Sequence, residues 1–506
     1  MILEGILSVL TPACLLWSLI GTVIGIIFGS IPGLTAVMAM VLFLPLSFGM
    51  PTAEGIALLL GLYVGGISGG CISAILLKIP GTPASLCTVF DGGPMADRGE
   101  AGKAIGVSVL YSFIGGILSA ASLIFIAPYL ARVALKFSPF EYCAVIFMSL
   151  TIIASLSGKS MINGLISGAA GLFVSCIGMS PIGGVLRCTL GARYMMSGIS
   201  TTVMLIGIFA IAEVIKSAAE PDIKGKKASY KLKGFGLSWK EFWGQTFNAL
   251  RSAVIGIGIG ILPGLGANTS SMLAYGIAQS NSKHPEKFGT GIIDGLVASE
   301  TANNANTGGA MIPALTLGIP GNTPTALLIA ALTVKGVTPG PLIFEKNGVL
   351  AYGVFTSFVL ANVMMLLLEW RGTPLFVKIL DLPKYIMYPA IIVLCMVGAF
   401  SDKSRTFDIL VAVGFGIVVY FLKKFGFATA PFILGNILGS LFETYYGRAM
   451  SAGGGSFLPF FTRPVSCVFM ILTVVCIVFV AKKNLRHEKN VLADDDGDDD
   501  AESEKA

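Results

Sequence analysis

Long apolar segments separated by short polar ones run through most of the chain. A helix needs about 20 mostly apolar residues to cross a bilayer. Segments that meet or approach this length begin near residues 12, 33, 55, 104, 140, 161, 198, 247, 308, 347, 385, 406, 428 and 463. A strand of a membrane barrel would instead alternate apolar and polar residues over about 10 positions. The pattern therefore predicts an all-α polytopic membrane protein with about 12 transmembrane helices.

The composition agrees with this class. Of the 506 residues, 54% are hydrophobic and 12% are charged, whereas about 25% are charged in an ordinary soluble domain. These values exclude a water-soluble protein, so we expect the chain to lie in a lipid bilayer and to have no nucleic-acid partner. The 63 glycines predict close helix contacts or broken helices.

Basic residues gather in two polar segments. Seven lysines lie between residues 216 and 240, and further basic residues follow the last apolar segment, from Lys482 to Lys489. Because cytoplasmic loops carry an excess of lysine and arginine, we predict that the loop 216–246 and the C-terminal tail are cytoplasmic. The end of the tail, 485–506, is rich in acids without apolar partners and is expected to be disordered.

Two motif fragments and the cysteine spacing do not support an enzyme or a cofactor site. Gly158-Lys159-Ser160 resembles the end of a P-loop, but Ile153 stands where the first glycine is required. Gly66-Ile67-Ser68-Gly69 matches a string of intramembrane serine proteases, but His284 and His487 lie in polar segments and cannot supply the base. The nine cysteines form no C-x-x-C pair, so we expect neither disulfides nor a metal centre beyond a bound Na⁺.

Two motifs occur twice along the chain. Gly29–Ala36 recurs as Gly260–Ala267, which is 231 residues later. Gly69-Gly70 followed by Ile79-Pro80-Gly81 recurs as Gly308-Gly309 followed by Ile319-Pro320-Gly321, offset by 239 to 240 residues. The repeat predicts two related halves, 1–215 and 247–484, joined by the loop 216–246. Whether the halves are parallel or inverted depends on the number of spans, which the sequence leaves open.

The repeated Pro-Gly pairs predict broken helices. Proline removes a backbone donor and glycine permits positive φ, so each pair interrupts its helix. The half-helix that follows such a break directs unpaired N–H groups and a positive dipole end at the gap, which suits a carboxylate. Matching breaks in two halves are typical of a transporter's central site. The predicted substrate-binding residues are Pro32, Gly33, Lys78, Gly81, Thr82, Ser85, Gly264, Asn268, Thr269, Gly321, Asn322 and Thr323.

A polar cluster before Gly308 is the predicted cation site. It consists of Glu300, Asn303, Asn304 and Asn306, which together offer one acid and several amide oxygens inside an apolar region. The alternative interpretation is a helix interface, since small and polar residues also pack helices in bilayers. Lys78 is either a fixed cation for the substrate or an interfacial lysine, and Asp91 is expected to shape a turn or a helix cap.

These motifs resemble the large membrane subunit of the tripartite tricarboxylate transporters, the TctA family. The closest matches are Ile79–Ser85 with Asp91-Gly92, Leu262–Ala267, and Glu300–Gly309. The resemblance implies a bacterial inner-membrane secondary carrier driven by a sodium or proton gradient. It also implies a small four-helix membrane subunit and a periplasmic solute-binding protein that delivers a carboxylate. Lys78 and Asp294 depart from the family pattern, in which asparagine and glutamate respectively are common.

We therefore expect a cation-coupled carrier that imports tricarboxylates or related carboxylates, and not an enzyme. No cofactor is expected apart from Na⁺ or H⁺ as the coupling ion. Two other functions remain as alternatives. One is an intramembrane enzyme that acts on a lipid or a peptide, and the other is an ion channel.

Overall fold

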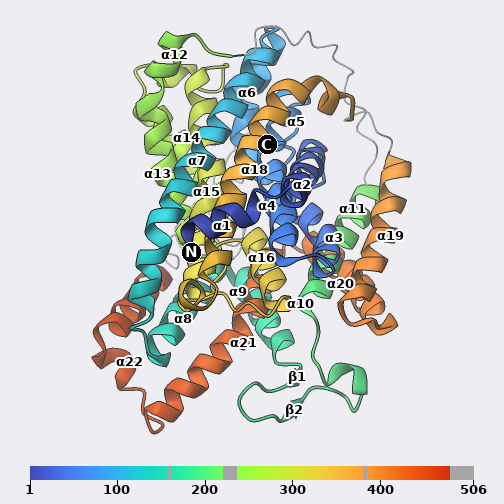
Figure 1. Ribbon diagram of the computed structural model, residues 1–506, viewed down its shortest axis with the longest axis vertical. Coiled ribbons are helices and arrows are strands. Elements are labelled where there is room, and N and C mark those ends of the chain that lie inside the picture. Colours follow the sequence, from blue (N-terminus) through green and yellow to red (C-terminus); the bar gives the residue numbers. More distant parts are fainter. Residues whose placement is uncertain (156–160, 220–235, 380–383, 479–506) are drawn as a thin grey trace, which may run out of the picture. The chain divides into compact units, whose positions relative to one another are not determined.

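The computed structural model describes residues 1–155, 161–219, 236–379 and 384–478, and almost every regular element in them is a helix (Figure 1). The chain forms two compact units. The first comprises Met1–Lys136 with Ser197–Lys424, and the second comprises Phe137–Met196 with the chain from Phe425 onward. Each unit takes residues from both sides of the loop 216–246, so the division into two sequence halves stays a prediction.

The first unit contains most of the helices. Before the loop they are α1 (Ile2–Val9), α2 (Pro12–Ser30), α3 (Ala36–Phe48), α4 (Thr52–Ser68), α5 (Gly70–Leu76), the 3₁₀ turn η1 (Pro83–Ser85), α6 (Leu86–Asp97), α7 (Ala101–Ala134), α10 (Thr201–Leu205), the π-helix η3 (Ile206–Ile211) and α11 (Ala212–Ala219). After it they are α12 (Trp239–Gly244), α13 (Thr246–Ile261), α14 (Gly266–Ser280), η4 (Pro285–Lys287), α15 (Ile293–Leu317), α16 (Thr323–Val334), α17 (Ile343–Lys346), α18 (Gly348–Ile379), α19 (Lys384–Lys403) and α20 (Thr406–Lys424).

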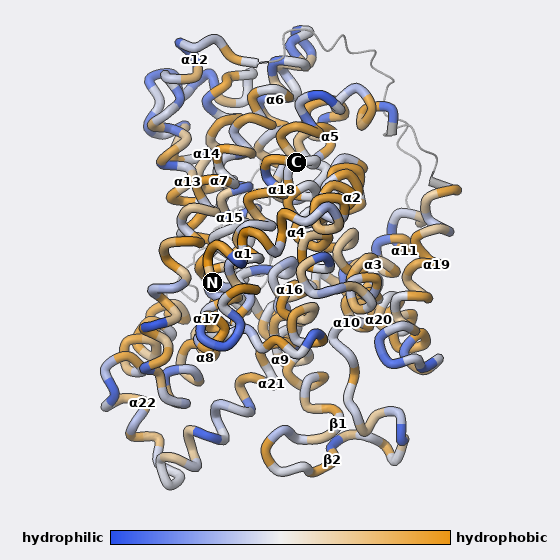
Figure 2. The backbone as a smooth tube through the Cα atoms, viewed as in Figure 1, coloured by the Kyte–Doolittle hydropathy of each residue, from blue (hydrophilic) through white to orange (hydrophobic). Residues whose placement is uncertain are grey.

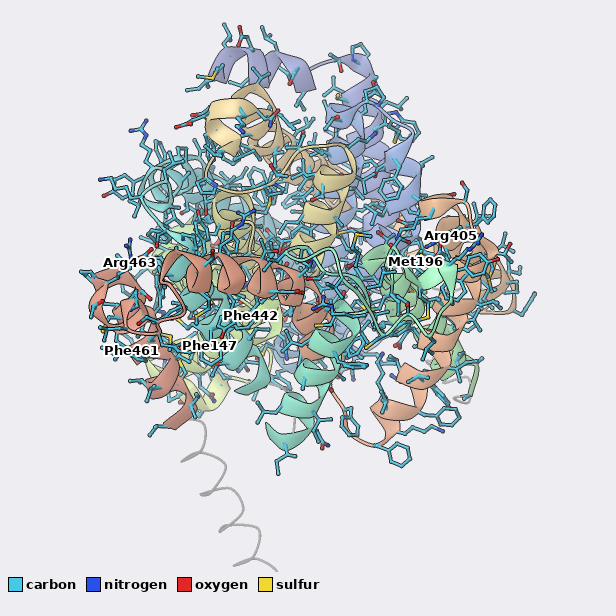
Figure 3. All side chains as sticks on the ribbon, turned by 90° about the horizontal axis from the view of Figure 1, so that it is seen from below. Phe147, Met196, Arg405, Phe442, Phe461 and Arg463 are labelled. Carbon is cyan, nitrogen blue, oxygen red and sulfur yellow. The ribbon has the colours of Figure 1, made fainter. Side chains whose placement is uncertain are left out.

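The second unit is smaller. It contains α8 (Pro139–Ser155), α9 (Met161–Ser175), η2 (Arg193–Met195), α21 (Thr429–Ala452), α22 (Pro459–Thr462) and the helix Pro464–Val478. Within the described residues, the only strands are β1 (Gly178–Met179) and β2 (Leu186–Arg187), which pair antiparallel. Both guanidinium –NH₂ groups of Arg187 donate to Glu443 of α21 at 2.9 Å. Aromatic rings of α8 and α21 meet at Phe147 and Phe442, with centroids 6.3 Å apart (Figure 3).

Seven helices in the described residues are long and apolar enough to cross a membrane. They are Pro12–Ser30, Thr52–Leu76, Ala101–Ala134, Thr201–Ala219, Gly348–Lys378, Tyr385–Lys403 and Thr406–Lys424. Six shorter apolar helices accompany them, and hydrophobic residues run along most helices of the molecule (Figure 2). An all-helical membrane protein is therefore the correct class, while the total of about 12 spans stays a prediction.

Two long helices of the first unit, α4 and α15, are deeply buried. Every described residue of α4 from Gly55 to Ser68, and of α15 from Gly295 to Thr316, is buried. α4 is apolar, whereas α15 buries a run of serine, threonine and asparagine side chains. Buried polar groups need hydrogen-bond partners. The helices around α15 must therefore supply donors and acceptors for these side chains.

The same close packing occurs in two helix pairs. A β-carbon at Gly29 of α2 would lie 2.3 Å from the carbonyl oxygen of Gly66 in α4, and one at Gly260 of α13 would lie 2.7 Å from that of Asn306 in α15. Only glycine lets helix backbones approach so closely. Gly260 follows Gly29 by 231 residues and Asn306 follows Gly66 by 240. The repeated motifs thus occupy matching places in two similar helix pairs.

Candidate functional site

All four Pro-Gly pairs of the repeated motifs interrupt helices. The first lies between α2 and α3, the second between α5 and η1, the third between α13 and α14, and the fourth between α15 and α16. Gly33 and Gly264 have φ of 90° and 86°, a conformation that favours glycine. The chain therefore bends at these positions because proline removes a donor and glycine accepts the turn.

The first two breaks are in contact, as are the last two, and the elements that follow the breaks pack together across the repeat. A β-carbon at Gly81 would meet the carbonyl oxygen of Gly29 at 2.2 Å, which joins the first two breaks. The N–H of Gly264 donates to the carbonyl of Gly321 at 2.8 Å, which joins the last two. Between the halves, η1 packs against α14 and α3 packs against α16. The polypeptide thus gathers the four interruptions into one region of the first unit.

The predicted substrate-binding residues differ in how accessible they are. Gly81, Thr82, Ser85 and Gly321 are buried, whereas Pro32, Gly33, Gly264, Thr269, Asn322 and Thr323 are half-buried. Asn268 and Lys78 are exposed. The group therefore extends from the interior to the surface.

Several of these side chains already have partners. The hydroxyls of Thr82 and Ser85 lie 2.9 Å apart, and Thr269 donates to the carbonyl of Leu265 at 2.7 Å. Asn322 caps α16, where its side-chain oxygen accepts from the N–H of Thr325 at 3.1 Å. A ligand at the breaks would replace or extend these local contacts.

Asn322 also connects the two sides of the repeat. Its amide donates to the hydroxyl of Tyr63 in α4 at 2.8 Å and to the Oδ1 of Asn306 in α15 at 3.4 Å. The Asn306 amide reaches the carbonyl of Gly256 at 3.5 Å. Through these bonds the start of α16 is tied to both buried helices.

Lys78 lies apart from the buried residues of this group. It adopts φ of 55°, and its ammonium forms an ion pair with Asp97 at 2.7 Å, with both side chains about half exposed. Its charge is therefore directed at a carboxylate of α6 on the surface.

Glu300 is completely buried and held by hydroxyl groups. Thr88 of α6 and Ser112 of α7 both donate to its carboxylate, Ser112 at 3.1 Å. Ser112 in turn accepts from the amide of Asn304 at 2.8 Å. In the part of the chain that is described, no lysine, arginine or histidine forms an ion pair with Glu300. A buried carboxyl without a cationic neighbour must be neutralised by a proton or a bound ion.

Asn303 lies beside Glu300 on the same face of α15. Its side chain is fully buried and interacts with the Glu300 carboxyl, whereas its amide oxygen has no hydrogen-bond partner among the described residues. The hydroxyl of Thr301 is buried without a partner too. Unpaired buried polar groups are costly, so a ligand that uses the Asn303 oxygen and the Glu300 carboxylate would relieve that cost.

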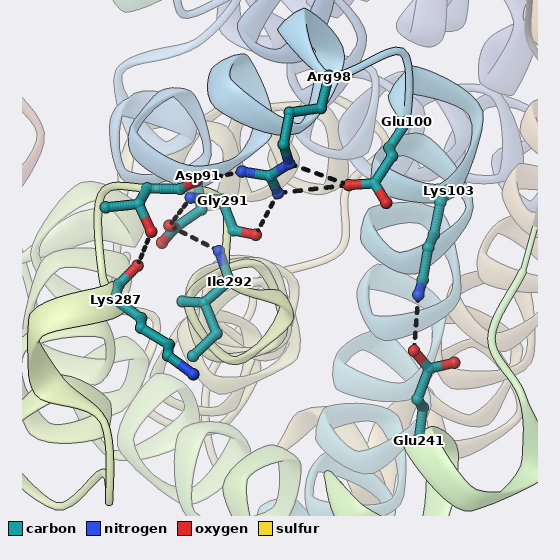
Figure 4. Close-up of polar contacts among 9 residues, drawn as sticks. Asp91, Arg98, Glu100, Lys103, Glu241, Lys287, Gly291 and Ile292 are labelled. Atoms are coloured by element: carbon teal, nitrogen blue, oxygen red, sulfur yellow. Dashed lines mark hydrogen bonds and ion pairs between the residues drawn. The ribbon is translucent and has the colours of Figure 1, made fainter.

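Two residues of the first half hold the entry to α15. Oδ1 of Asp91 accepts from the N–H groups of Gly289, Gly291 and Ile292 at 2.9 to 3.0 Å, and its Oδ2 accepts from the Tyr275 hydroxyl at 2.9 Å. Arg98 donates to the carbonyls of the same segment, including that of Gly291 at 2.7 Å (Figure 4). Asp91 therefore fixes the turn that precedes α15, as expected for an acid that shapes a turn.

The short helix α12 is fastened nearby. Lys103 of α7 donates to Glu241 at 2.6 Å (Figure 4), and this bond lowers the pKa of Glu241 to about 2. Both residues, together with Asp294, line a polar cavity of about 490 Å³ beside the start of α15. Asp294 therefore faces this cavity and not the Glu300 cluster.

The sequence analysis did not single out Glu369. This residue of α18 is fully buried, and one of its oxygens accepts from the Ser68 hydroxyl at 2.7 Å. A signal was present, because Glu369 is a lone acid at the end of a long apolar run. The Gly-x-Ser-Gly string around Ser68 thus has a carboxyl neighbour.

Comparison with known proteins assigns the chain to a class. The sequence model of the tripartite tricarboxylate transporter TctA family matches residues 15–434. The chain belongs to the TctA family. The resemblance carried by the Pro-Gly motifs is thereby confirmed, and the class is that of a multi-pass transporter subunit from a tripartite system.

Two relatives of this TctA-family chain come from Agrobacterium vitis. One, an uncharacterized 52.8 kDa protein in the TAR-I ttuC' 3' region, is 32% identical over 486 residues, covering 96% of this chain and 97% of the relative. The other, an uncharacterized protein in the TAR-II ttuC' 3' region, is 34% identical over 239 residues, covering 47% of this chain and 99% of the relative. No solved structure matches the chain.

Proposed function

We propose that this TctA-family chain is the large membrane subunit of a cation-coupled secondary transporter that imports tricarboxylates or related carboxylates. The observation that carries the proposal is the gathering of four helix breaks beside a buried acid without a cationic partner. The breaks supply the kind of polar backbone that binds a carboxylate, and the acid supplies a place for a coupling ion.

The half-helices that follow the breaks are suited to anionic ligands. The first turn of a helix carries four N–H groups without intrahelical partners. In α3 the side chain of Thr35 accepts from one of these groups, the N–H of Met38, at 3.2 Å. In α16 the side chain of Asn322 accepts from another, the N–H of Thr325. The remaining donors, the hydroxyls of Thr82 and Ser85 and the backbone at the glycines of the breaks, would contact carboxylate groups of the substrate.

The Glu300 cluster would hold the coupling cation. Its carboxylate, with the unpaired amide oxygen of Asn303 and the neighbouring side chains of Asn304 and Asn306, offers oxygen ligands suited to Na⁺. A proton on Glu300 would neutralise the same charge. Either ion would make burial of the carboxyl favourable.

The working assembly follows from the tripartite family. We propose that a periplasmic binding protein delivers the carboxylate, that a small four-helix membrane subunit completes the complex, and that it resides in a bacterial inner membrane. The loop 216–246 and the tail 485–506 would face the cytoplasm. Most of that loop and all of that tail lie outside the described residues.

The test is uptake by proteoliposomes that contain the chain with both partner subunits. Labelled di- and tricarboxylates are supplied while sodium or proton gradients are imposed separately. Wild-type protein should accumulate substrate under one of the gradients and show saturation. Uptake indifferent to both gradients would defeat the coupling, and flux that does not saturate would favour a channel.

Two variants locate the cation site. Glu300→Gln and Asn303→Ala should each reduce gradient-driven uptake at least about tenfold, because a loss of about 1.4 kcal/mol of cation binding has that effect. Glu345→Gln changes an exposed acid of α17 and should leave uptake unchanged. If both variants take up substrate as fast as the wild-type protein, Glu300 is not part of the cation site.

A further inference from the structure

We propose that Glu369 is a second cation-binding site, distinct from Glu300, which takes up a proton or a small monovalent metal ion during transport. The inference depends on the proposed transport function. It is carried by a buried carboxyl with one hydroxyl partner and one free oxygen, placed at the helix junction that leads to the second Pro-Gly break.

The surroundings of Glu369 leave half of its carboxyl unsatisfied. Oε2 accepts from the hydroxyl of Ser68 at 2.7 Å, whereas Oε1 is buried and has no partner among the described residues. The hydroxyl of Thr373, one turn later, bonds to the backbone carbonyl of Glu369 instead. The free oxygen Oε1 is therefore the atom at which a proton or a metal ion would bind.

Among the described residues, no positive charge is paired with the Glu369 carboxylate. The elements packed against α18 are α1, α2, α4, α7 and α17, and among the described residues none of these elements supplies a cation paired with the carboxyl. The titratable groups that interact with it are Glu300 and Cys71, and Arg371 on α18 itself is exposed. An ionised carboxylate in such surroundings is strongly disfavoured, so the group needs a bound cation.

Glu369 differs from Glu300 in what holds it. Glu300 is bonded by Thr88 and Ser112, from α6 and α7, whereas Glu369 is bonded by Ser68 at the end of α4. The two acids interact electrostatically. Two negative charges that interact in a buried region are hard to maintain together. The cations at the two sites would therefore bind in a linked manner.

The Ser68 contact connects Glu369 to the region of the breaks. Ser68 ends α4, and Gly70 begins α5. A β-carbon at Gly70 would lie 2.8 Å from the hydroxyl oxygen of Thr82 and would also collide with Ser85, so this junction touches the second break directly. Ser68, the partner of the Glu369 carboxyl, is thus two residues away from Gly70, whose backbone lies against the predicted substrate residues.

The experiment measures how many cations move with each substrate. The complete transporter in proteoliposomes is examined by reversal potential, with proton and sodium gradients varied separately, and by exchange of labelled for unlabelled substrate. Glu369→Gln should keep substrate exchange, lower the cation-to-substrate ratio by about one, and weaken the dependence of the reversal potential on the ion that Glu369 binds. An unchanged ratio and reversal potential in this variant would overturn the inference.

If Glu369→Gln does not insert into the membrane, a second variant tests the same inference. Ser68→Ala removes the hydroxyl donor but keeps the acid, and should shift the concentration of Na⁺ or the pH at which uptake is half-maximal by about tenfold. An unshifted ion dependence in Ser68→Ala would also overturn the inference. Glu345→Gln serves as the exposed control. Failure of wild-type protein to respond to any gradient would contradict the proposed function, whereas normal wild-type behaviour with unchanged variants would contradict only the second site.

Discussion

Single residues of the first half determine how α15 of the second half begins. Asp91 accepts three backbone N–H groups from the segment that precedes α15, and it is completely buried. Arg98 holds carbonyls of the same segment. Because Glu300 and Asn303 lie on the following turns of α15, these two residues position the proposed cation site without contacting it.

Removing the Asp91 carboxylate should weaken this arrangement. Asp91→Ala leaves three part-buried backbone donors without their acceptor, and we expect a decrease of about 3 kcal/mol in the free energy of unfolding. Asp91→Asn keeps an acceptor and should recover part of the loss. Thermal unfolding of the purified protein in detergent measures both. Equal stability of the Ala and Asn variants would contradict the role of Asp91 as the acceptor for this segment.

At the scale of elements, glycines determine which helices can approach. α13 carries three glycines near its end, and they differ in their surroundings. Gly256 and Gly260 face the backbone of α15, whereas nothing lies within 4 Å of a β-carbon at Gly258. The face of α13 that carries Gly256 and Gly260 therefore packs against α15, and the face that carries Gly258 does not.

This difference gives a matched pair of variants. Gly260→Ala should destabilise the protein by about 1 to 3 kcal/mol, because the new methyl group would press on the backbone of α15. Gly258→Ala should be neutral or more stable by up to about 1 kcal/mol, because alanine favours the helix. Thermal unfolding and uptake measure both variants. A larger loss for Gly258→Ala would show that α13 does not pack as described.

At the scale of the whole molecule, the chain separates into two compact units with their own contacts. The second unit is stabilised by the double hydrogen bond between Arg187 and Glu443 and by an ion pair between Arg463 and Glu141. All four breaks, Glu300 and Glu369 belong to the first unit. Substitutions in the second unit should therefore change its stability without changing ion or substrate binding in the first unit.

Hydrogen exchange tests this separation. Arg187→Met removes a two-bond contact to Glu443, so amides of β1, β2 and α21 should exchange about tenfold faster, equivalent to about 1.4 kcal/mol of local stability. Amides of α15 should keep their wild-type protection. Faster exchange in α15 would mean that the two units unfold together.

The sequence alone determined the class, the repeated motifs and the four helix breaks. Apolar length and Pro-Gly chemistry act locally, since a Pro-Gly pair favours an interruption through its own backbone. The family was readable for the same reason, because its motifs are these local breaks. The acid Glu300 could be named as well, since an ionisable residue in an apolar region is conspicuous by itself.

Only the tertiary structure decided which groups meet. Lys78 pairs with Asp97 on the surface, Asp91 holds the segment before a helix that begins 202 residues later, and Glu369 is bonded to a serine of another helix. Such pairings depend on long-range packing, which no pattern of neighbouring residues encodes. The surroundings of a buried carboxyl, and hence the need for a bound cation, therefore emerge only when distant helices are brought into contact.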